Sequence, residues 1–283
     1  MQPIVIAIDF SNTSLHALEY AISMSNRIGT NLHLIWVDKI SMQESVYPDL
    51  SYESKNEIKK RFDELISQYK GKLSKGLTME YKLRKGKIYR EIDNYAKSVD
   101  AGLIIAGTHG ISGYEEYWIG SNAYKIVSFT SIPVITVRHD YPLDRGISRI
   151  LALMDGSNET IQKIPFTAKL ARLFDAEVIL LTTHNNNLKS IQRIAEKFSL
   201  MASNYLKDNN IKVTEDSFVS SNLTKSALEY TISCGADLIS IMTEQETPVN
   251  VHIGAQAQQL ISQSPVPVLS ITPVEKFSLT SLI

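Results

Sequence analysis

The chain has 283 residues, of which 43% are hydrophobic and 21% charged, and its formal net charge is −1. This length suits two domains better than one core, and the near-neutral charge argues against a general nucleic-acid or membrane-surface binder. The single cysteine, Cys234, excludes an internal disulfide and a cysteine-based metal site. We find no run long enough to span a membrane and no signal peptide, so the predicted location is the cytoplasm.

Apolar runs alternate with helical patterns through the first half of the chain. Strands are predicted where a run is apolar on both faces or, as at Thr78–Leu83, where apolar and polar residues alternate. Helices are predicted where apolar residues recur with helical spacing. The predicted elements, starting and ending with a strand, are Pro3–Asp9, Thr13–Ile28, Leu32–Val37, Glu44–Lys75, Thr78–Leu83, Ile88–Ser98, Leu103–Ala106, Asn122–Phe129 and Val134–Val137. This alternation predicts a parallel sheet with helices on both faces.

The second half of the chain repeats this order of elements. Its matching segments include Ile150–Asp155, Ile161–Phe174, Val178–Thr182, Ile191–Asn209 and Lys212–Phe218. Internal duplication is a strong signal of repeated architecture. The predicted fold class is therefore α/β, with two tandem five-stranded parallel-sheet domains at residues 1–140 and 147–275, joined through the weakly apolar segment 139–148.

A glycine pattern occurs in the first half without a full counterpart in the second. Gly107-Thr-His-Gly110 follows a predicted buried strand, and Gly120-Ser121 follows nine residues later at a predicted helix start. We expect such glycines to adopt positive φ and to turn backbone amides toward an anion such as phosphate. The second half has Met242-Thr-Glu-Gln245 at the matching place, and its Gly254-Ala255 is one position out of register.

An acidic residue supports a nucleotide site beside these glycines. Asp9 ends the first predicted strand, and the carboxyl ends of parallel strands meet at one edge of a sheet, where a carboxylate can accept a ribose hydroxyl. The alternative is that the glycines only form tight turns and a helix start. The preceding strand, the Gly-Ser helix start and the acid together favour a nucleotide site.

These motifs resemble those of the universal stress protein family over nearly the whole chain. The matching segments are Ile8-Asp-Phe-Ser11, Gly86, Ala101–Gly107, the glycine pattern and Ile132-Pro-Val134. The resemblance implies a Rossmann-like, adenine nucleotide alpha hydrolase-like fold and a bound ATP or related adenine nucleotide. It implies that adenine and ribose meet Ala7, Asp9 and Val37. It also implies that the phosphates are surrounded by Ala106, Gly107, His109, Gly110, Gly120, Ser121, Asn122 and Ala123.

The resemblance also implies a function. Members of this family are stress-linked regulators with weak or no hydrolysis, so we expect a regulator with an unidentified protein partner rather than an efficient enzyme. Two alternatives stay open: a nucleotide-free interaction protein that forms an intramolecular pseudo-dimer, and a slow ATPase. By the same resemblance, Val134–Val137 and Val268–Ile271 pair within one chain, and two chains can form a homodimer.

Two charged features allow further interpretation. Glu115 and Glu116 would repel a triphosphate unless a cation lies between them, which gives the hypothesis that one of them reaches a phosphate-bound Mg²⁺. The alternative is that both glutamates face solvent. The basic clusters Lys55–Arg61 and Lys82–Arg90 are interrupted by apolar residues at helix or strand period, which is typical of solvated faces.

Overall fold

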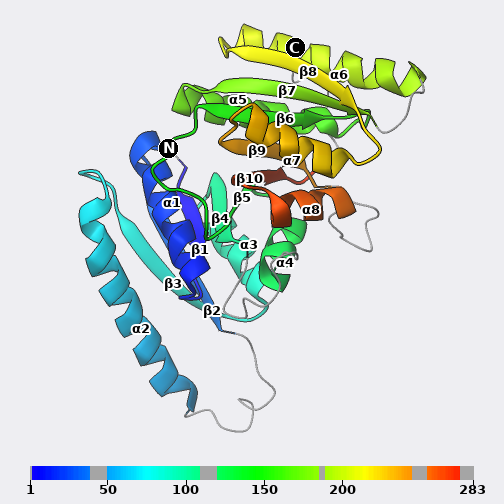
Figure 1. Cartoon of the computed structure of the whole chain (residues 1–283). Helices are drawn as coiled ribbons and strands as arrows, with labels where there is room; N and C mark the ends of the chain where they lie inside the picture. The colour runs from blue at the N-terminus through cyan, green and yellow to red at the C-terminus, as the bar shows by residue number, and fades with distance from the viewer. Residues whose placement is uncertain (1, 39–49, 109–119, 185–188, 244–253, 275–283) are drawn as a thin grey trace.

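A computed structural model describes residues 2–38, 50–108, 120–184, 189–243 and 254–274. Strands and helices alternate in the N-terminal half, and the same order recurs in the C-terminal half (Figure 1). The N-terminal half contains β1 (Ile4–Ala7), α1 (Asn12–Ile28), β2 (Leu32–Asp38), α2 (Leu50–Tyr69), the 3₁₀ turn η1 (Lys70–Lys72), β3 (Met79–Lys85), α3 (Ile88–Ser98), β4 (Leu103–Gly107), α4 (Ser121–Phe129) and β5 (Val134–Val137). The C-terminal half contains β6 (Arg149–Met154), the 3₁₀ turn η2 (Thr160–Lys163), α5 (Ile164–Phe174), β7 (Glu177–His184), α6 (Lys189–Asp208), β8 (Val213–Val219), α7 (Leu223–Ser233), β9 (Leu238–Met242), α8 (Ala255–Gln263) and β10 (Val268–Ile271).

In the part of the chain that the structure describes, the strands form one ten-stranded sheet in the order β3-β2-β1-β4-β5-β10-β9-β6-β7-β8. All neighbours within each half are parallel, which confirms the predicted α/β fold. The two halves meet through an antiparallel pair, β5 with β10, in which Ile135 lies opposite Leu269. The predicted pairing of the two last strands is therefore confirmed, and it merges the two five-stranded sheets into one.

Helices cover both faces of this sheet, as its doubly apolar strands require. Helix α1 packs against β1 and β4 and also contacts α5 of the other half. Two further helix pairs are in contact, α3 with α4 in the N-terminal half and α7 with α8 in the C-terminal half. None of the helices in the described ranges is both long and apolar enough to cross a lipid bilayer.

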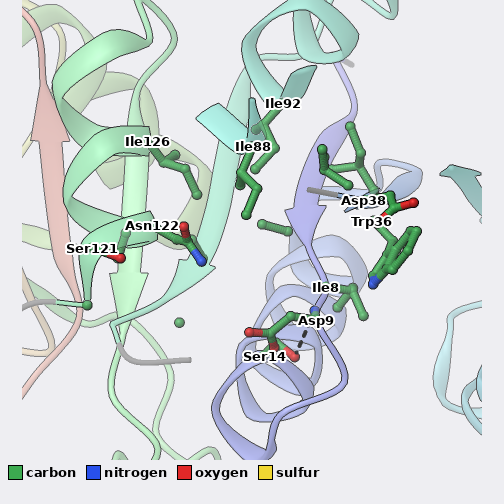
Figure 2. A pocket seen from close by; sticks show the side chains of 17 residues that line it. Ile8, Asp9, Ser14, Trp36, Asp38, Ile88, Ile92, Ser121, Asn122 and Ile126 are labelled. Atoms are coloured by element: carbon green, nitrogen blue, oxygen red, sulfur yellow. Dashed lines mark hydrogen bonds between the residues drawn. The ribbon is translucent and has the colours of Figure 1, made fainter. Parts of the chain in front are cut away.

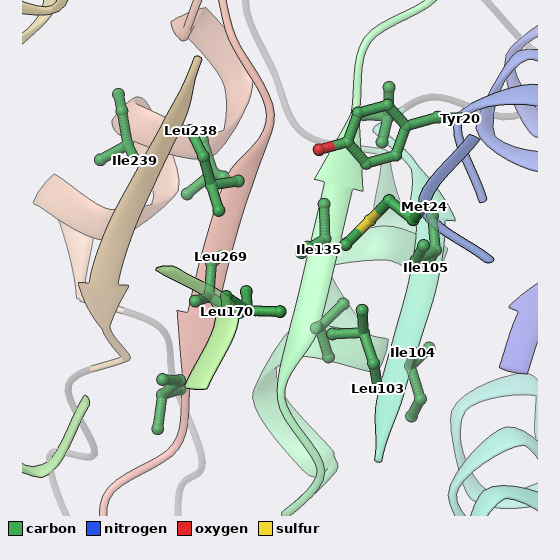
Figure 3. Close-up of a cluster of buried hydrophobic side chains, with 14 of the residues drawn as sticks. Tyr20, Met24, Leu103, Ile104, Ile105, Ile135, Leu170, Leu238, Ile239 and Leu269 are labelled. Carbon is green, nitrogen blue, oxygen red and sulfur yellow. The ribbon is translucent and has the colours of Figure 1, made fainter. Parts of the chain in front are cut away.

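The hydrophobic core is continuous across the junction of the halves (Figure 3). Ile135 and Leu269 are fully buried on the two paired strands, and Met24 of α1 lies beside Ile135. Burial of apolar area is the main source of folding free energy, so this shared core binds the two halves into one body.

Two predicted helices differ from the observed ones. The predicted helix Ile161–Phe174 is divided into η2 and α5, because Pro165 lacks the N–H of a helix interior and instead stands in the first turn of α5. The predicted helix Glu44–Lys75 is observed over Leu50–Tyr69 and tightens into η1. Residues 44–49 of that prediction lie outside the described residues.

Candidate functional site

A cavity of about 540 Å³ opens at the carboxyl ends of β1, β2 and β4, opposite the start of α4. This is the edge of a parallel sheet at which ligands bind in open α/β folds. Nine residues predicted for the nucleotide site line this cavity: Ala7, Asp9, Val37, Ala106, Gly107, Gly120, Ser121, Asn122 and Ala123. The other two, His109 and Gly110, lie outside the described residues, as do Glu115 and Glu116.

Asp9 is held by a tight turn between β1 and α1. Its Oδ1 accepts hydrogen bonds from the backbone N–H and the hydroxyl of Ser11, at 3.0 and 2.6 Å. Ser11 is also the N-cap of α1, because its hydroxyl accepts a hydrogen bond from the N–H of Ser14 at 3.2 Å. The Ser14 hydroxyl in turn accepts from the Asp9 N–H at 3.3 Å (Figure 2). The carboxylate is thus fixed in direction at the cavity wall.

Gly107 is required by close packing. A Cβ atom at this position would lie 2.6 Å from Cγ2 of Thr13 and 3.0 Å from the Thr13 carbonyl oxygen. Contacts this short are not tolerated between folded side chains. The end of β4 can therefore approach the first turn of α1 only because residue 107 has no side chain.

The expectation of positive φ at the described loop glycines is wrong. Gly120 has a φ of −56°, and Gly107 is not among the residues with positive φ. The backbone can present its amides here in an ordinary conformation, because a helix start exposes N–H groups without a left-handed residue.

Gly120 serves as the N-cap of α4. It has no side chain to accept hydrogen bonds, so the first-turn N–H groups of Ser121, Asn122 and Ala123 have no capping side chain. The first backbone bond of the helix runs from Tyr124 N–H to the Gly120 carbonyl, at 2.9 Å. The Gly120 N–H donates to the Thr108 carbonyl at 2.8 Å, and this hydrogen bond fixes the helix start beside the end of β4. The positive end of the helix dipole therefore faces the cavity.

The two walls of the cavity differ in chemistry (Figure 2). Ser121 and Asn122 at the start of α4 lie on one side, whereas Asp9, Trp36 and Asp38 lie on the other. The apolar side chains of Ile88, Ile92 and Ile126 lie along the space between these walls. The cavity thus has an amide-rich end that suits an anion and a carboxylate end that suits hydroxyl or amino groups.

Eight lining residues were not predicted: Ile8, Ser14, Ile35, Trp36, Asp38, Ile88, Ile92 and Ile126. Asp38 ends the second strand as Asp9 follows the first, so the same argument from strand ends could have found it. Ile88 and Ile92 belong to the apolar stripe of a predicted helix, but their exposure to a cavity depends on how that helix packs.

The C-terminal half repeats the turn of Asp9. Ile150 has the same register with its neighbouring strands as Ile4, so Asp155 is the counterpart of Asp9. Asp155 Oδ1 accepts from the Ser157 N–H at 2.8 Å and hydroxyl at 2.6 Å, and its own N–H donates to the Thr160 hydroxyl at 3.1 Å. This turn therefore forms in both halves and does not by itself identify a ligand site.

The two halves have different residues at other equivalent positions. Met242 takes the place of Gly107, and the buried Lys163 takes the place of Ala17. The Lys163 Nζ donates to the carbonyl and hydroxyl oxygens of Thr160, at 2.6 and 3.1 Å. Burial lowers the pKa of Lys163 to about 8, and the charge of Asp155 opposes this shift.

The helix start itself is present in both halves. Gly254 is the N-cap of α8, with a φ of −55°, just as Gly120 is the N-cap of α4. The shift of one position noted in the sequence arises because the connection from β9 to α8 is one residue shorter than that from β4 to α4.

The described ranges contain no cluster of three or more His, Cys, Asp or Glu side chains able to hold a metal ion.

Comparison with known proteins gives consistent matches. A model of the universal stress protein family matches residues 1–138. Universal stress protein YxiE of Bacillus subtilis is 31% identical over 143 residues, covering 47% of this chain and 97% of that protein. Universal stress protein MJ0531 of Methanocaldococcus jannaschii is 28% identical over 137 residues, covering 48% of this chain and 81% of that protein. The crystal structure of a universal stress protein from Archaeoglobus fulgidus has a TM-score of 0.76 at 17% identity, over 95% of this chain and 98% of that one, so both halves share its fold.

Proposed function

This chain belongs to the universal stress protein family, and on that basis we propose that it is a cytoplasmic stress-response regulator that binds an adenine nucleotide. The binding unit is the domain of residues 1–140, and the domain of residues 147–275 is a partner without nucleotide. The ligand is ATP or a related adenine nucleotide. Occupancy of the site alters a contact with another protein through the loop Gly107–Gly120, of which residues 109–119 lie outside the described part of the chain.

The observation that carries this proposal is the opposition of the two cavity walls. Phosphate groups suit the uncapped amides of Ser121, Asn122 and Ala123, because a helix start combines free N–H groups with a positive dipole end. The ribose hydroxyls suit the Asp9 carboxylate on the opposite wall. A volume of about 540 Å³ lies within the range of small-molecule sites.

The base suits the apolar part of the wall next to Asp9. Ile8 and the indole of Trp36 lie beside Asp9 on this wall (Figure 2), and Val37 lines the same cavity. An aromatic ring beside the site offers a stacking surface and a spectroscopic probe. Helix amides carry only partial charges, so a triphosphate would keep most of its own charge, and we include Mg²⁺ in the proposal for ATP.

The test uses the two equivalent aspartates. Asp9→Asn keeps an oxygen that can accept the Ser11 hydrogen bonds but removes the charge that faces the ligand. We expect it to weaken ATP or AMP binding about tenfold or more, as for the loss of a charge-assisted hydrogen bond. Asp155→Asn makes the same change in an equivalent turn of the C-terminal half and should leave affinity unchanged.

Calorimetry with and without Mg²⁺ measures these affinities, and quenching of Trp36 fluorescence in a Trp118→Phe background reports where the nucleotide binds. Equal losses in the two aspartate variants, or saturable binding without a change in Trp36 emission, would contradict the proposed site. Phosphate release during prolonged incubation with ATP distinguishes a binding protein from a slow ATPase.

One observation favours a second candidate function. The antiparallel pair of β5 and β10 makes the chain an intramolecular pseudo-dimer, which suits an interaction protein that needs no nucleotide. Absence of any ATP-induced rise in melting temperature would favour this candidate, since a ligand at 100 times its dissociation constant stabilises the native state by roughly 2.7 kcal/mol.

A further inference from the structure

The strongest concentration of charge in the molecule lies at one end of its sheet. Residues 55–90 contain twelve Lys or Arg and four Asp or Glu, a net charge of +8 in a chain whose total is −1. This segment forms most of α2, all of β3 and the start of α3. Figure 1 shows α2 and β3 together at one extreme of the molecule, far from α6 and β8 at the other.

Aromatic contacts fix how α2 lies on this end of the sheet. The ring of Phe62 stacks on Tyr81 of β3 with centroids 4.7 Å apart, and the Tyr81 hydroxyl donates to Asp63 at 3.2 Å. One flank of α2 faces the central strands of the sheet. On this flank the Arg61 guanidinium lies 4.0 Å from the centre of the ring of Phe10, a residue that follows β1 in the chain. At 100° per residue, the exposed Lys59 lies on the other flank, toward the outer edge of β3, between the exposed Lys55 and the Asp63 that bonds to Tyr81.

The opposite face of β3 carries two cations and one acid, Glu80. Side chains alternate along a strand, so Lys82 and Arg84 point away from the face on which Tyr81 meets α2. Both are exposed. Arg84 lies near α3, where its charge opposes the burial that raises the pKa of Tyr95. Cationic side chains therefore flank the outer edge of β3 on both faces of the sheet.

The outer edge of β3 is unpaired in the part of the chain that the structure describes. β3 is the terminal strand of the sheet and pairs with β2 along its whole length, from Met79 opposite Leu32 to Lys85 opposite Asp38. Within the described ranges no strand pairs with its other edge. A strand edge presents N–H and C=O groups that can accept an added strand.

We propose that the outer edge of β3 binds an extended acidic segment of a partner protein, which adds as a further strand of the sheet. Main-chain hydrogen bonds would provide affinity. Acidic side chains at neighbouring positions of the segment point to opposite faces of the sheet, so they would meet Lys82 and Arg84 on one face and Lys55 and Lys59 on the other. The same cations prevent two copies of β3 from pairing with each other, because like charges would then lie opposite one another. This surface goes beyond the nucleotide cavity and is independent of it.

A peptide fits this surface better than a nucleic acid does. A nucleic acid would use the charges but not the row of strand N–H and C=O groups, whereas an extended peptide uses both. The probe is a labelled ten-residue peptide in which pairs of Glu alternate with pairs of Thr, so that Glu side chains lie on both faces of the added strand. The same peptide with Lys in place of Glu is the control ligand. Fluorescence anisotropy at low salt measures binding to the full chain.

We expect the acidic peptide to bind and the basic one not to bind. The variant Lys82→Glu/Arg84→Glu should weaken binding on the order of tenfold, because attraction becomes repulsion on one face of the edge. The matched control is Lys189→Glu/Arg193→Glu on α6, which changes one exposed Lys and one exposed Arg, about one helical turn apart, at the other end of the molecule. It should leave affinity unchanged, and circular dichroism checks that both variants are folded.

Hydrogen exchange distinguishes strand addition from binding by charge alone, because charge attraction without main-chain hydrogen bonds would not protect the amides of β3. Added pairing should slow the exchange of alternate backbone amides in β3, Met79–Lys85, and leave β8 unchanged. The proposal is overturned by equal loss of affinity in both variants, by binding without protection of β3, or by failure of the peptide to bind. Binding of a single-stranded oligonucleotide or of phosphatidylserine vesicles in place of the peptide would also overturn it.

Discussion

Single side chains distinguish the two halves at the residue scale. Asp9 and Asp155 sit in turns with the same hydrogen bonds, so the acid is not the difference. The difference lies at position 107, where glycine allows β4 to approach α1 and the other half has Met242, and at Lys163, whose amine is buried near Asp155. Packing and charge at these positions distinguish the half with the proposed nucleotide site from the other half.

The first prediction concerns Gly107. Gly107→Ala should destabilise the protein by about 1–3 kcal/mol, because its methyl group would overlap Thr13. Denaturant unfolding measures the change. Gly146→Ala is the matched control, since a Cβ there meets nothing within 4 Å, and it should change stability by less than about 0.5 kcal/mol. Similar losses in both variants would show that the close approach of β4 and α1 is not the cause.

The second prediction concerns the buried amine of Lys163. Its folded pKa of about 8 lies below the ordinary value of 10.5, so between these pH values the unfolded chain holds a proton that the folded chain lacks. The contribution of Lys163 to the free energy of unfolding should therefore rise as pH increases from 8 toward 10.5, by up to about 3 kcal/mol. Below pH 8 the full cost of burying the ammonium remains.

Lys163→Met isolates this effect from other titrating groups. The variant should be more stable than the unmodified protein at pH 7, and the difference should shrink between pH 8 and 10. Chemical denaturation across this pH range measures it. A difference that stays constant with pH would mean that Lys163 keeps an ordinary pKa in the fold.

At the scale of elements, helix starts position the site. The N-cap of α1 links the helix to Asp9, because the Ser11 hydroxyl both accepts from the Ser14 N–H and donates to the carboxylate. The start of α4 has no such side-chain cap. The start of α1 is thus capped by the side chain of its own N-cap residue, whereas the N-cap of α4 is a glycine that has no side chain to cap it.

The third prediction tests the capped helix start. Ser11→Ala should destabilise the protein by about 1–2 kcal/mol, because the N-terminal turn of α1 loses its acceptor and Asp9 loses a donor. It should also weaken nucleotide binding, since the carboxylate is then less well oriented. Ser67→Ala on the exposed side of α2 is the control and should be neutral within about 0.5 kcal/mol. Thermal unfolding compares the two, and equal stability would contradict a capping role for Ser11.

At the scale of the whole molecule, the two halves act as one body. The connecting segment is anchored by Tyr141, which is 2% exposed and packs its ring against Tyr20 with centroids 5.9 Å apart. Asp237 accepts hydrogen bonds from the N–H groups of Ser148 and Arg149, at 2.9 and 3.1 Å. Since β5 and β10 use each other's edges, any association between chains must use other surfaces.

The fourth prediction is that the two halves unfold together. Both tryptophans, Trp36 and Trp118, belong to the N-terminal half, so their fluorescence reports that half, while far-ultraviolet circular dichroism reports the whole chain. The two signals should give the same midpoint in thermal unfolding, because breaking β5 from β10 would expose a shared core. Separate midpoints would show that the halves are independent.

Most of the fold could be predicted from the sequence, because short residue patterns determine where strands and helices form. Strands that are buried on both faces read as continuous apolar runs, so their order and the parallel sheets could be predicted. The same reasoning named Asp9 and the start of α4, because strand and helix ends have recognisable residues. It did not find Trp36 or Ile88 as lining residues, since a side chain becomes part of a cavity only when distant elements pack around it.

The sequence by itself determined the order of strands and helices, their repetition and the family resemblance, because these depend on periodicity and short motifs. The resemblance also led us to expect the pairing of β5 with β10. The tertiary structure decided that Gly107 packs too closely against Thr13 for a side chain at that position, and that Lys163 is buried near Asp155. These features depend on contacts between residues far apart in the chain, and no local pattern encodes the distance between them.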